Sequence, residues 1–149
     1  MPALVSNRKA RFDYEIMETL DAGIELLGFE TKALRAGQGS LDGSRVTARG
    51  AEAYLMNASI TPLQPKNTPD DYDPARNRRL LLTKKEIAQI EKAEGTKGLT
   101  IVPLEVYNKG RWIKVKIAIV RGKKKFDKRE TLKRKQSDRD IQRTLKNEY

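Results

Sequence analysis

Hydrophobic and polar residues alternate most regularly in the second half of the chain, over residues 99–107 and 112–120. Alternation with a period of two is typical of β-strands, because successive side chains point to opposite faces of a sheet. The residues between the two segments include Gly110, which favours a hairpin turn. The two segments are therefore predicted to form an antiparallel hairpin.

The same alternation assigns the faces of the two strands. The polar side of the second strand carries Lys114 and Lys116 and is predicted to face outward. In the first strand, strict alternation places Val102, Leu104 and Val106 on one face. The aliphatic side of the second strand is predicted to line the core with Ile113, Val115, Ile117 and Ile119.

Weaker patterns predict further strands. Residues 12–20 alternate and residues 24–27 are largely apolar, with turn-forming residues between them, so a hairpin is expected here. Residues 45–48 and 53–56 flank a second glycine-containing turn and predict another hairpin. Residues 1–11 are interpreted as a short basic arm.

A short helix is predicted over residues 30–36. It ends before Gly37, since glycine commonly follows the last residue of a helix. Ala33 and Leu34 are expected to face the core, and the charged residues, Glu30 among them, to point elsewhere.

A second helix is predicted to begin after Thr83. Thr83 and Glu86 have the spacing of a capping box, in which each side chain accepts a hydrogen bond from the other residue's backbone. The helix is expected to place Ile87 and Ile90 inward and to end at Gly95.

Together these elements predict a mainly β fold. About six short strands, two to three short helices and glycine turns fit a small closed barrel such as an OB-fold. Barrels of this type often bind nucleic acids on their surface. No glycine-rich nucleotide-binding motif accompanies them.

Charge is distributed unevenly along the chain. The formal net charge is +11, and residues 121–149 hold twelve Lys or Arg against five Asp or Glu, with few large apolar residues. This predicts a folded body, residues 1–121, followed by a basic tail, residues 122–149, that builds no core. Such a tail is typical of segments that bind nucleic acid, and a solvated tail that only aids solubility is the alternative.

The chain contains neither His nor Cys. Disulfides, thiol nucleophiles, His-based acid–base catalysis and zinc sites with nitrogen or sulfur ligands are therefore excluded. A protein without enzymatic activity, cofactor or metal is expected. No apolar run is long enough to span a membrane and no signal-peptide region is recognised, so a cytoplasmic protein is expected.

Three prolines interrupt residues 64–79 and predict a loop. Asp70, Asp71 and Asp73 in this loop suggest a carboxylate metal site, as in a magnesium-dependent nuclease. They lack the spacing and the closing glutamate of a calcium loop. They are therefore interpreted as ordinary loop carboxylates.

Several sequence blocks, taken in order, resemble SmpB, the SsrA-binding (tmRNA-binding) protein family of bacteria. The resemblance covers nearly the whole chain. Its most specific parts are the Glu-Thr-Lys-Ala-Leu-Arg-Ala-Gly block and the Gly-Lys-Lys and Asp-Lys-Arg pair near the start of the tail. The blocks are residues 7–10, 21–26, 30–37, 76–86, 114–118 and 122–129.

The resemblance implies a specific function. It implies an OB-fold body and a tail that is disordered when free and helical on the ribosome. It implies a monomeric adaptor that binds the tRNA-like domain of tmRNA and reaches stalled ribosomes together with elongation factor Tu, for trans-translation. The tail would enter the empty mRNA channel and replace the missing codon–anticodon pairing. A constitutive ribosomal OB-fold protein that binds RNA is the alternative that composition leaves open.

By position, the resemblance also implies two sets of functional residues. The tmRNA-binding set is Asn7, Lys9, Arg11, Asp21, Glu30, Lys32, Arg35, Leu81, Thr83, Lys114 and Lys116. The ribosome-binding set in the tail is Lys123, Lys124, Phe126, Asp127, Lys128, Arg129, Thr144, Leu145 and Lys146.

Three positions depart from the commonest family pattern. Asp21 stands where Glu is usual and would make a shorter version of the same contact. Thr83 stands where Asn or His is common, so a side-chain amide contact is not available there. Phe126 stands where His is usual and retains an aromatic face on which a base can stack.

Overall fold

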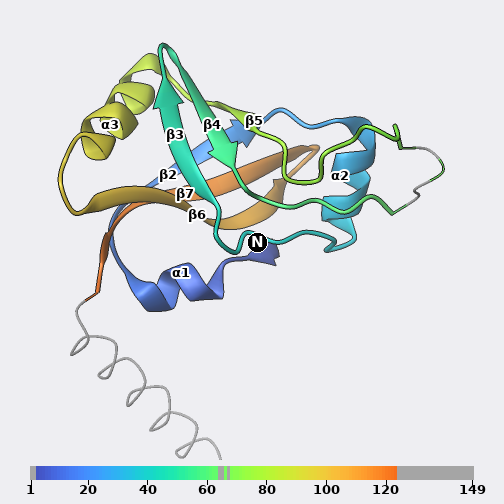
Figure 1. Cartoon of the computed structure of the whole chain (residues 1–149), viewed down its shortest axis with the longest axis horizontal. Coiled ribbons are helices and arrows are strands. Elements are labelled where there is room, and N and C mark those ends of the chain that lie inside the picture. The colour runs from blue at the N-terminus through green and yellow to red at the C-terminus, as the bar shows by residue number, and fades with distance from the viewer. Residues whose placement is uncertain (1–2, 64–65, 67, 124–149) are drawn as a thin grey trace, which may run out of the picture.

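The computed structural model describes residues 3–63, 66 and 68–123, and it contains a seven-stranded antiparallel sheet and three helices within them (Figure 1). The predicted tail residues Lys124, Phe126, Asp127, Lys128, Arg129, Thr144, Leu145 and Lys146 lie outside the described residues. The elements are β1 (Ala3–Ser6), α1 (Arg8–Asp13), β2 (Tyr14–Ile24), α2 (Gly28–Arg35), β3 (Arg45–Arg49), β4 (Glu52–Met56), β5 (Arg78–Leu81), α3 (Lys84–Glu94), β6 (Leu99–Lys109) and β7 (Trp112–Gly122).

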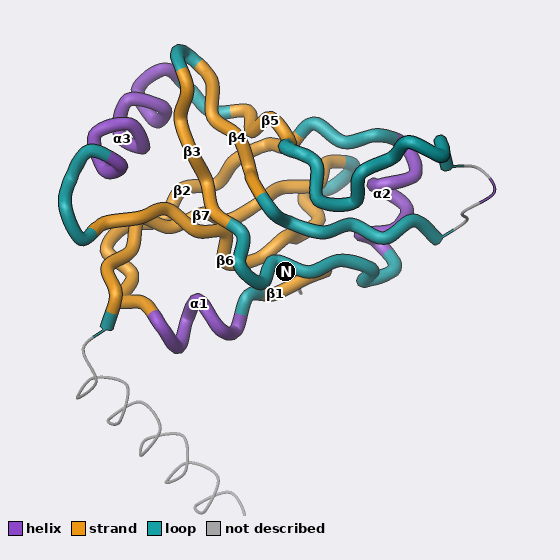
Figure 2. Tube along the Cα trace, viewed as in Figure 1, coloured by secondary structure: helices purple, strands orange, loops and turns teal. Residues whose placement is uncertain are grey.

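The strands follow the order β1-β6-β7-β2-β5-β4-β3 across the sheet. The sheet curls so that β3 lies against β6, and α3 packs on both strands (Figure 2). Helices α2 and α3 lie at opposite ends of the curled sheet, and α1 lies beneath it (Figure 1). The predicted OB-fold-like β-barrel with short helices is confirmed.

The β6–β7 hairpin is confirmed, and its predicted inner residues are buried. Ile113, Val115, Ile117 and Ile119 all belong to the main core. The prediction for β6 is wrong in one respect, because a bulge between Pro103 and Glu105 interrupts the alternation. Val106 therefore enters the main core, whereas Val102 and Leu104 belong to a second cluster.

This second cluster lies under α1. Ala10 of α1 packs with Ala118 and Val120 of β7, so the outer face of β7 is covered at this end. The interpretation of residues 1–11 as an arm is wrong, because β1 pairs with β6 and the Asn7 side chain caps α1. Asn7 Oδ1 accepts a hydrogen bond from the Ala10 backbone at 3.1 Å.

The predicted hairpin within residues 12–27 is also wrong. Residues 14–24 form one continuous strand, β2, which pairs with β7 along its length and with β5 at its end. Gly23 makes no turn there; a Cβ atom at this position would lie 3.1 Å from the Leu81 Cβ. Glycine at this position therefore permits a close approach of β5 rather than a reversal of the chain.

The other predicted hairpin and both predicted helices are confirmed, although the first helix spans Gly28–Arg35 rather than residues 30–36, and β5 begins at Arg78 within the predicted loop 64–79. β3 and β4 form the expected hairpin, and α3 begins after Thr83 and is followed by its C-cap, Gly95. The Thr83 backbone donates to the Glu86 carboxylate at 3.0 Å, and the Glu86 backbone donates to the Thr83 hydroxyl at 3.2 Å. The N-terminal end of α3 is thereby fixed beside the end of β5.

Candidate nucleic-acid interface

A polar surface crosses strands β6, β7, β2 and β5 in two adjacent rows. In one row Lys114 of β7 lies between Tyr107 of β6 and Gly23 of β2, and Gly23 in turn faces Leu81 of β5. Cross-strand neighbours of this kind have side chains within contact distance on the same face. The rows therefore bring residues from distant parts of the sequence onto one outward surface.

The second row lies two residues further along β7. Lys116 is flanked by Asp21 of β2 and Glu105 of β6. The Tyr107 hydroxyl donates a hydrogen bond to Asp21 Oδ1 at 2.8 Å and so links the two rows. Desolvation, together with this hydrogen bond, raises the pKa of Tyr107 to about 12.

Two neighbouring grooves follow this surface. One is lined by Asp21, Tyr107 and Lys116, and the other by Asp21, Leu81, Thr83 and Lys114. Asp21 thus lies where the grooves meet. We refer to this surface as the Asp21 face, comprising Asp21, Leu81, Thr83, Tyr107, Lys114 and Lys116.

Five of the eleven body residues predicted as functional lie on the Asp21 face. They are Asp21, Leu81, Thr83, Lys114 and Lys116. Tyr107 was not predicted, although its position opposite Lys114 on the predicted hairpin is a signal that could have found it.

Of the other predicted residues, Arg11 and Arg35 contact residues close to this face, and Lys9 and Lys32 are exposed on the same two helices. Arg11 of α1 reaches Glu105, with 3.8 Å between the guanidinium and the carboxylate, and Lys9 is exposed on the same helix. On α2, Lys32 is exposed, and Arg35 donates to the Arg111 carbonyl in the β6–β7 turn at 2.9 Å. Helix α2 therefore presents its cationic end beside the start of β7.

Two predicted contact residues are buried, which corrects their expected exposure. Asn7 is 3% exposed, and its side-chain amide donates to the Pro103 carbonyl at 2.9 Å. Glu30 is 0% exposed, although the sequence interpretation had pointed it away from the core. Glu30 lies three and four residues before Ala33 and Leu34, so the helical period already placed all three on one face.

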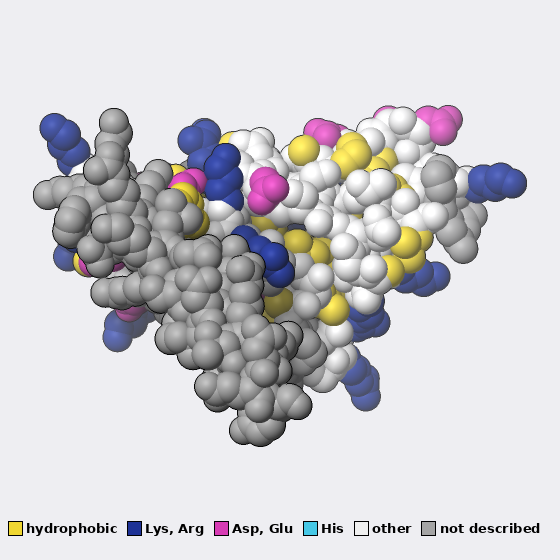
Figure 3. Space-filling model, turned by 90° about the horizontal axis from the view of Figure 1, so that it is seen from below, with side chains coloured by type: hydrophobic (Ala, Val, Ile, Leu, Met, Phe, Trp, Pro, Cys, Tyr) yellow, Lys and Arg dark blue, Asp and Glu magenta, His cyan; other side chains and the backbone are white. Residues whose placement is uncertain are grey.

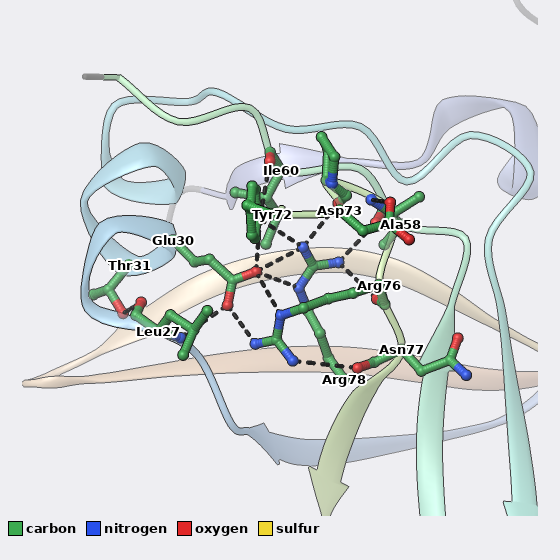
Figure 4. A network of polar contacts seen from close by, with 12 residues as sticks. Leu27, Glu30, Thr31, Ala58, Ile60, Tyr72, Asp73, Arg76, Asn77 and Arg78 are labelled. Carbon is green, nitrogen blue, oxygen red and sulfur yellow. Dashed lines mark hydrogen bonds and ion pairs between the residues drawn. The ribbon is translucent and has the colours of Figure 1, made fainter. Parts of the chain in front are cut away.

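Glu30 is the centre of a network that also contains Tyr72, Arg76 and Arg78, and we call it the Glu30 network (Figure 4). Glu30 Oε2 accepts from the two nitrogens Nε and Nη2 of Arg78, at 2.9 and 2.7 Å, and from the Tyr72 hydroxyl at 2.8 Å. Arg76 donates to both carboxylate oxygens. The backbone of Leu27 donates to Glu30 Oε1 at 2.8 Å.

Arg78 also ties the loop before β5 to the core. Its guanidinium donates to the carbonyls of Ala58, Pro74 and Arg76 at 2.7, 2.8 and 3.1 Å. Burial alone would raise the pKa of Glu30, but the hydrogen bonds from Arg76, Leu27, Tyr72 and Arg78 lower it to about 2. Glu30 is therefore an ionised structural group whose acceptor sites are occupied by the protein.

On the face of the body seen in Figure 3, Lys and Arg side chains project at several points, with fewer Asp and Glu side chains among them. Within the described residues, no group of three or more carboxylates is arranged to hold a metal ion. In the loop that contains Asp70 and Asp71, the Asp73 carboxylate accepts a hydrogen bond from the Ala75 backbone at 2.9 Å. No helix among the described residues is long and apolar enough to cross a membrane.

The curled sheet and the Asp21 face define a small OB-fold-like barrel with a mixed cationic and acidic surface. The family model for the SmpB protein matches residues 4–147. The chain is 48% identical to an SsrA-binding protein of Gloeothece citriformis, covering 96% of this chain and 92% of that one. It is 49% identical to an SsrA-binding protein of Synechocystis, covering 94% and 91%.

A solved structure supports the same assignment. A chain from the structure described as "tmRNA-SmpB: a journey to the center of the bacterial ribosome" matches with a TM-score of 0.68 and 45% identity, covering 80% of this chain and 84% of that one. The protein belongs to the SmpB family.

Proposed function

We propose that this protein is an RNA-binding adaptor that binds the tRNA-like domain of tmRNA and delivers it to stalled ribosomes for trans-translation. The observation that carries the proposal is the family match across residues 4–147, joined to the exposed Asp21 face. The relatives are named SsrA-binding proteins, and the similar solved structure is of tmRNA-SmpB on the bacterial ribosome. These matches favour the adaptor over a constitutive ribosomal protein.

The Asp21 face has groups for both parts of RNA recognition. Lys114 and Lys116 supply cations for phosphates, and these contacts tolerate any sequence. Asp21 is an exposed carboxylate that accepts hydrogen bonds from base amino groups, and it therefore contributes selectivity. Leu81 is 49% exposed and offers an apolar contact to the bases or sugars beside them.

The flanking helices extend the contact area of the proposed interface. Lys9 and Arg11 of α1 and Lys32 and Arg35 of α2 contact phosphates on either side of the Asp21 face. Asn7 and Glu30 act from the interior, by fixing the start of α1 and the position of α2.

The tail acts on the ribosome in this proposal. Lys123 and the tail residues beyond it contact the decoding region and the empty mRNA channel, and the tail folds there as a helix. The entropy lost when the tail folds in the channel lowers its affinity for the ribosome, but it makes binding depend on an empty mRNA channel. The protein works as a cytoplasmic monomer without catalytic activity and meets elongation factor Tu only through tmRNA.

The proposed boundary between body and tail falls near the end of β7. β7 continues to Gly122, one residue past the predicted end of the body, and the Lys123 backbone donates to the Asp13 carbonyl at 3.0 Å. A truncation that ends after Lys123 therefore keeps all of β7 and this hydrogen bond.

A gel-shift comparison tests the proposal. The full chain and a 1–123 truncation are titrated with the tRNA-like domain of tmRNA, with ordinary tRNA as competitor, and both are assayed for tagging on stalled ribosomes. We expect tight, selective binding by both forms, and tagging by the full chain alone. Binding lost with the tail, or equal affinity for tRNA, would indicate generic attraction to RNA and overturn the proposal.

A further inference from the structure

Trp112 is the most exposed of the large hydrophobic residues that the structure describes. Its side chain is 71% exposed at the first position of β7, directly after the β6–β7 turn. The next residue, Ile113, is buried, so strand alternation directs Trp112 to the outward side, which it shares with Lys114. An indole exposed to this degree contributes little to the core.

The surroundings of Trp112 are cationic. Lys109 is its partner across the hairpin, Arg111 precedes it in the chain, and Lys114 follows on the same side of β7. Arg35 of α2 is held at this turn by its hydrogen bond to the Arg111 carbonyl. Asp21 and Glu105 flank Lys116 further along the strand, and Glu25, two residues after Gly23, is paired with Arg79.

An aromatic ring among cations complements a single-stranded nucleic acid. A nucleobase stacks on the ring, while the adjacent phosphates neutralise the Lys and Arg side chains. The separation also suits RNA that is already bound to the Asp21 face. Lys116 lies four positions after Trp112 on the strand, a distance of roughly 13 Å, which is about the rise of four nucleotide steps in a stacked strand.

We propose that Trp112 stacks on an unpaired nucleobase of the bound RNA, while Lys109, Arg111 and Lys114 contact the phosphates on either side of that base. This inference rests on the proposed function, because the RNA is the one that occupies the Asp21 face. It extends the interface along β7 to the tip of the β6–β7 hairpin. It also assigns a ligand to an exposed residue for which the fold has no evident use.

The full chain is suited to a direct test because it contains a single tryptophan. Its intrinsic emission is recorded during titration with the tRNA-like domain of tmRNA, with and without acrylamide. Stacking on a base is expected to quench the emission and to protect the ring from acrylamide. Ordinary tRNA at the same concentration provides the comparison for non-selective binding.

Substitutions complete the test. Trp112→Ala is expected to weaken binding roughly 5- to 150-fold, the usual range for loss of one stacked base, while Trp112→Phe retains most of the affinity. Met17→Ala is the matched control, because Met17 is also exposed, at 52%, but lies at the bulge of β2 near the opposite end of β7. This control is expected to bind like the parent protein.

The outcomes separate this inference from the proposed function. Tight, selective RNA binding with unchanged Trp112 emission, or with full affinity in Trp112→Ala, would overturn the stacking proposal and leave the adaptor function intact. If Trp112→Ala binds RNA normally but fails in tagging, Trp112 contacts a protein partner instead, and the inference is likewise wrong. Failure of the parent protein to bind the RNA would overturn the proposed function itself.

Discussion

The Glu30 network and the Asp21 face contain similar groups in different surroundings. In each, a tyrosine hydroxyl donates to a carboxylate at 2.8 Å, and in each a basic side chain lies beside that carboxylate. Glu30 and Arg78 are 0% exposed, whereas Asp21 is exposed. The same kinds of residue therefore hold the fold together in one region and remain accessible to a ligand in the other.

Burial explains why the Glu30 network is expected to contribute more to the stability of the fold than the Asp21 face. A buried ion pair must be fully hydrogen-bonded to offset the loss of hydration, and Glu30 meets this condition with donors from Leu27, Tyr72, Arg76 and Arg78. An exposed pair gains little net stability because water competes for it. Groups on the Asp21 face can thus exchange their partners for RNA at small cost to the fold.

Glu30→Gln should have the largest effect on stability. It leaves the Arg78 guanidinium buried without a counter-charge, and the expected loss in the free energy of unfolding is about 3–5 kcal/mol. Urea unfolding followed by circular dichroism measures it. The matched control is Glu25→Gln, which breaks an exposed pair with Arg79 and should cost less than about 1 kcal/mol. Equal losses of unfolding free energy in the two variants would contradict the distinction between the buried Glu30 network and exposed ion pairs.

The pH dependence of stability should also reflect the ionisation of the Glu30 carboxylate. The pKa of Glu30 is lowered from 4.5 to about 2, so its contribution is fully present above pH 4.5 and is lost as the pH falls toward 2. The expected contribution is on the order of 3 kcal/mol. Unfolding curves measured from pH 6 to pH 2 should show a larger loss for the parent protein than for Glu30→Gln. If the two proteins lost stability equally as the pH fell, Glu30 would not be the source of the pH dependence.

The two tyrosines sharpen the comparison without altering charge. Tyr72→Phe removes a donor from the part-buried network and should destabilise the fold by about 1–2 kcal/mol. Tyr107→Phe removes the matching hydrogen bond from the exposed face and should cost less than about 0.5 kcal/mol. Thermal unfolding of both variants in one buffer measures the two losses. A larger loss for Tyr107→Phe than for Tyr72→Phe would contradict the comparison.

Lys116→Gln should affect RNA binding rather than folding. Loss of one phosphate contact should weaken binding roughly fivefold and lower the slope of log affinity against log salt by about 0.7–0.9. Stability should stay within about 0.5 kcal/mol of the parent protein. Lys92→Gln, in the last turn of α3, is the control and should retain both the affinity and the slope. A similar loss in both variants would indicate diffuse attraction instead of a defined face.

The elements predicted correctly from the sequence have strong local signals. The β6–β7 hairpin follows from alternation, and α3 from the Thr83 and Glu86 capping box. α1 was missed because it is six polar-rich residues long and depends on the Asn7 cap and on packing against β7. The continuous β2 was missed because its pairing with β7 overrides the local turn preference of residues 21–23.

The candidate site was predictable only in part. The resemblance to SmpB supplied Asp21, Leu81 and Thr83, but their neighbourhood depends on the sheet order, which no local pattern encodes. Glu30 was assigned to the surface because a charged residue is usually exposed. Its partners Tyr72 and Arg78 lie more than 40 residues away in sequence, so the network could not be deduced from local spacing.

The most direct test of the Asp21 face is the selectivity of Asp21→Asn for RNA. The ratio of the dissociation constants for ordinary tRNA and for the tRNA-like domain of tmRNA is measured for the parent protein and the variant, alongside the free energy of unfolding. Because both RNAs carry phosphates, this ratio is insensitive to the added net charge. We predict that the ratio falls roughly tenfold, which is about 1.4 kcal/mol, while stability is unchanged within about 0.5 kcal/mol. An unchanged ratio would contradict the assignment of this face to tmRNA recognition.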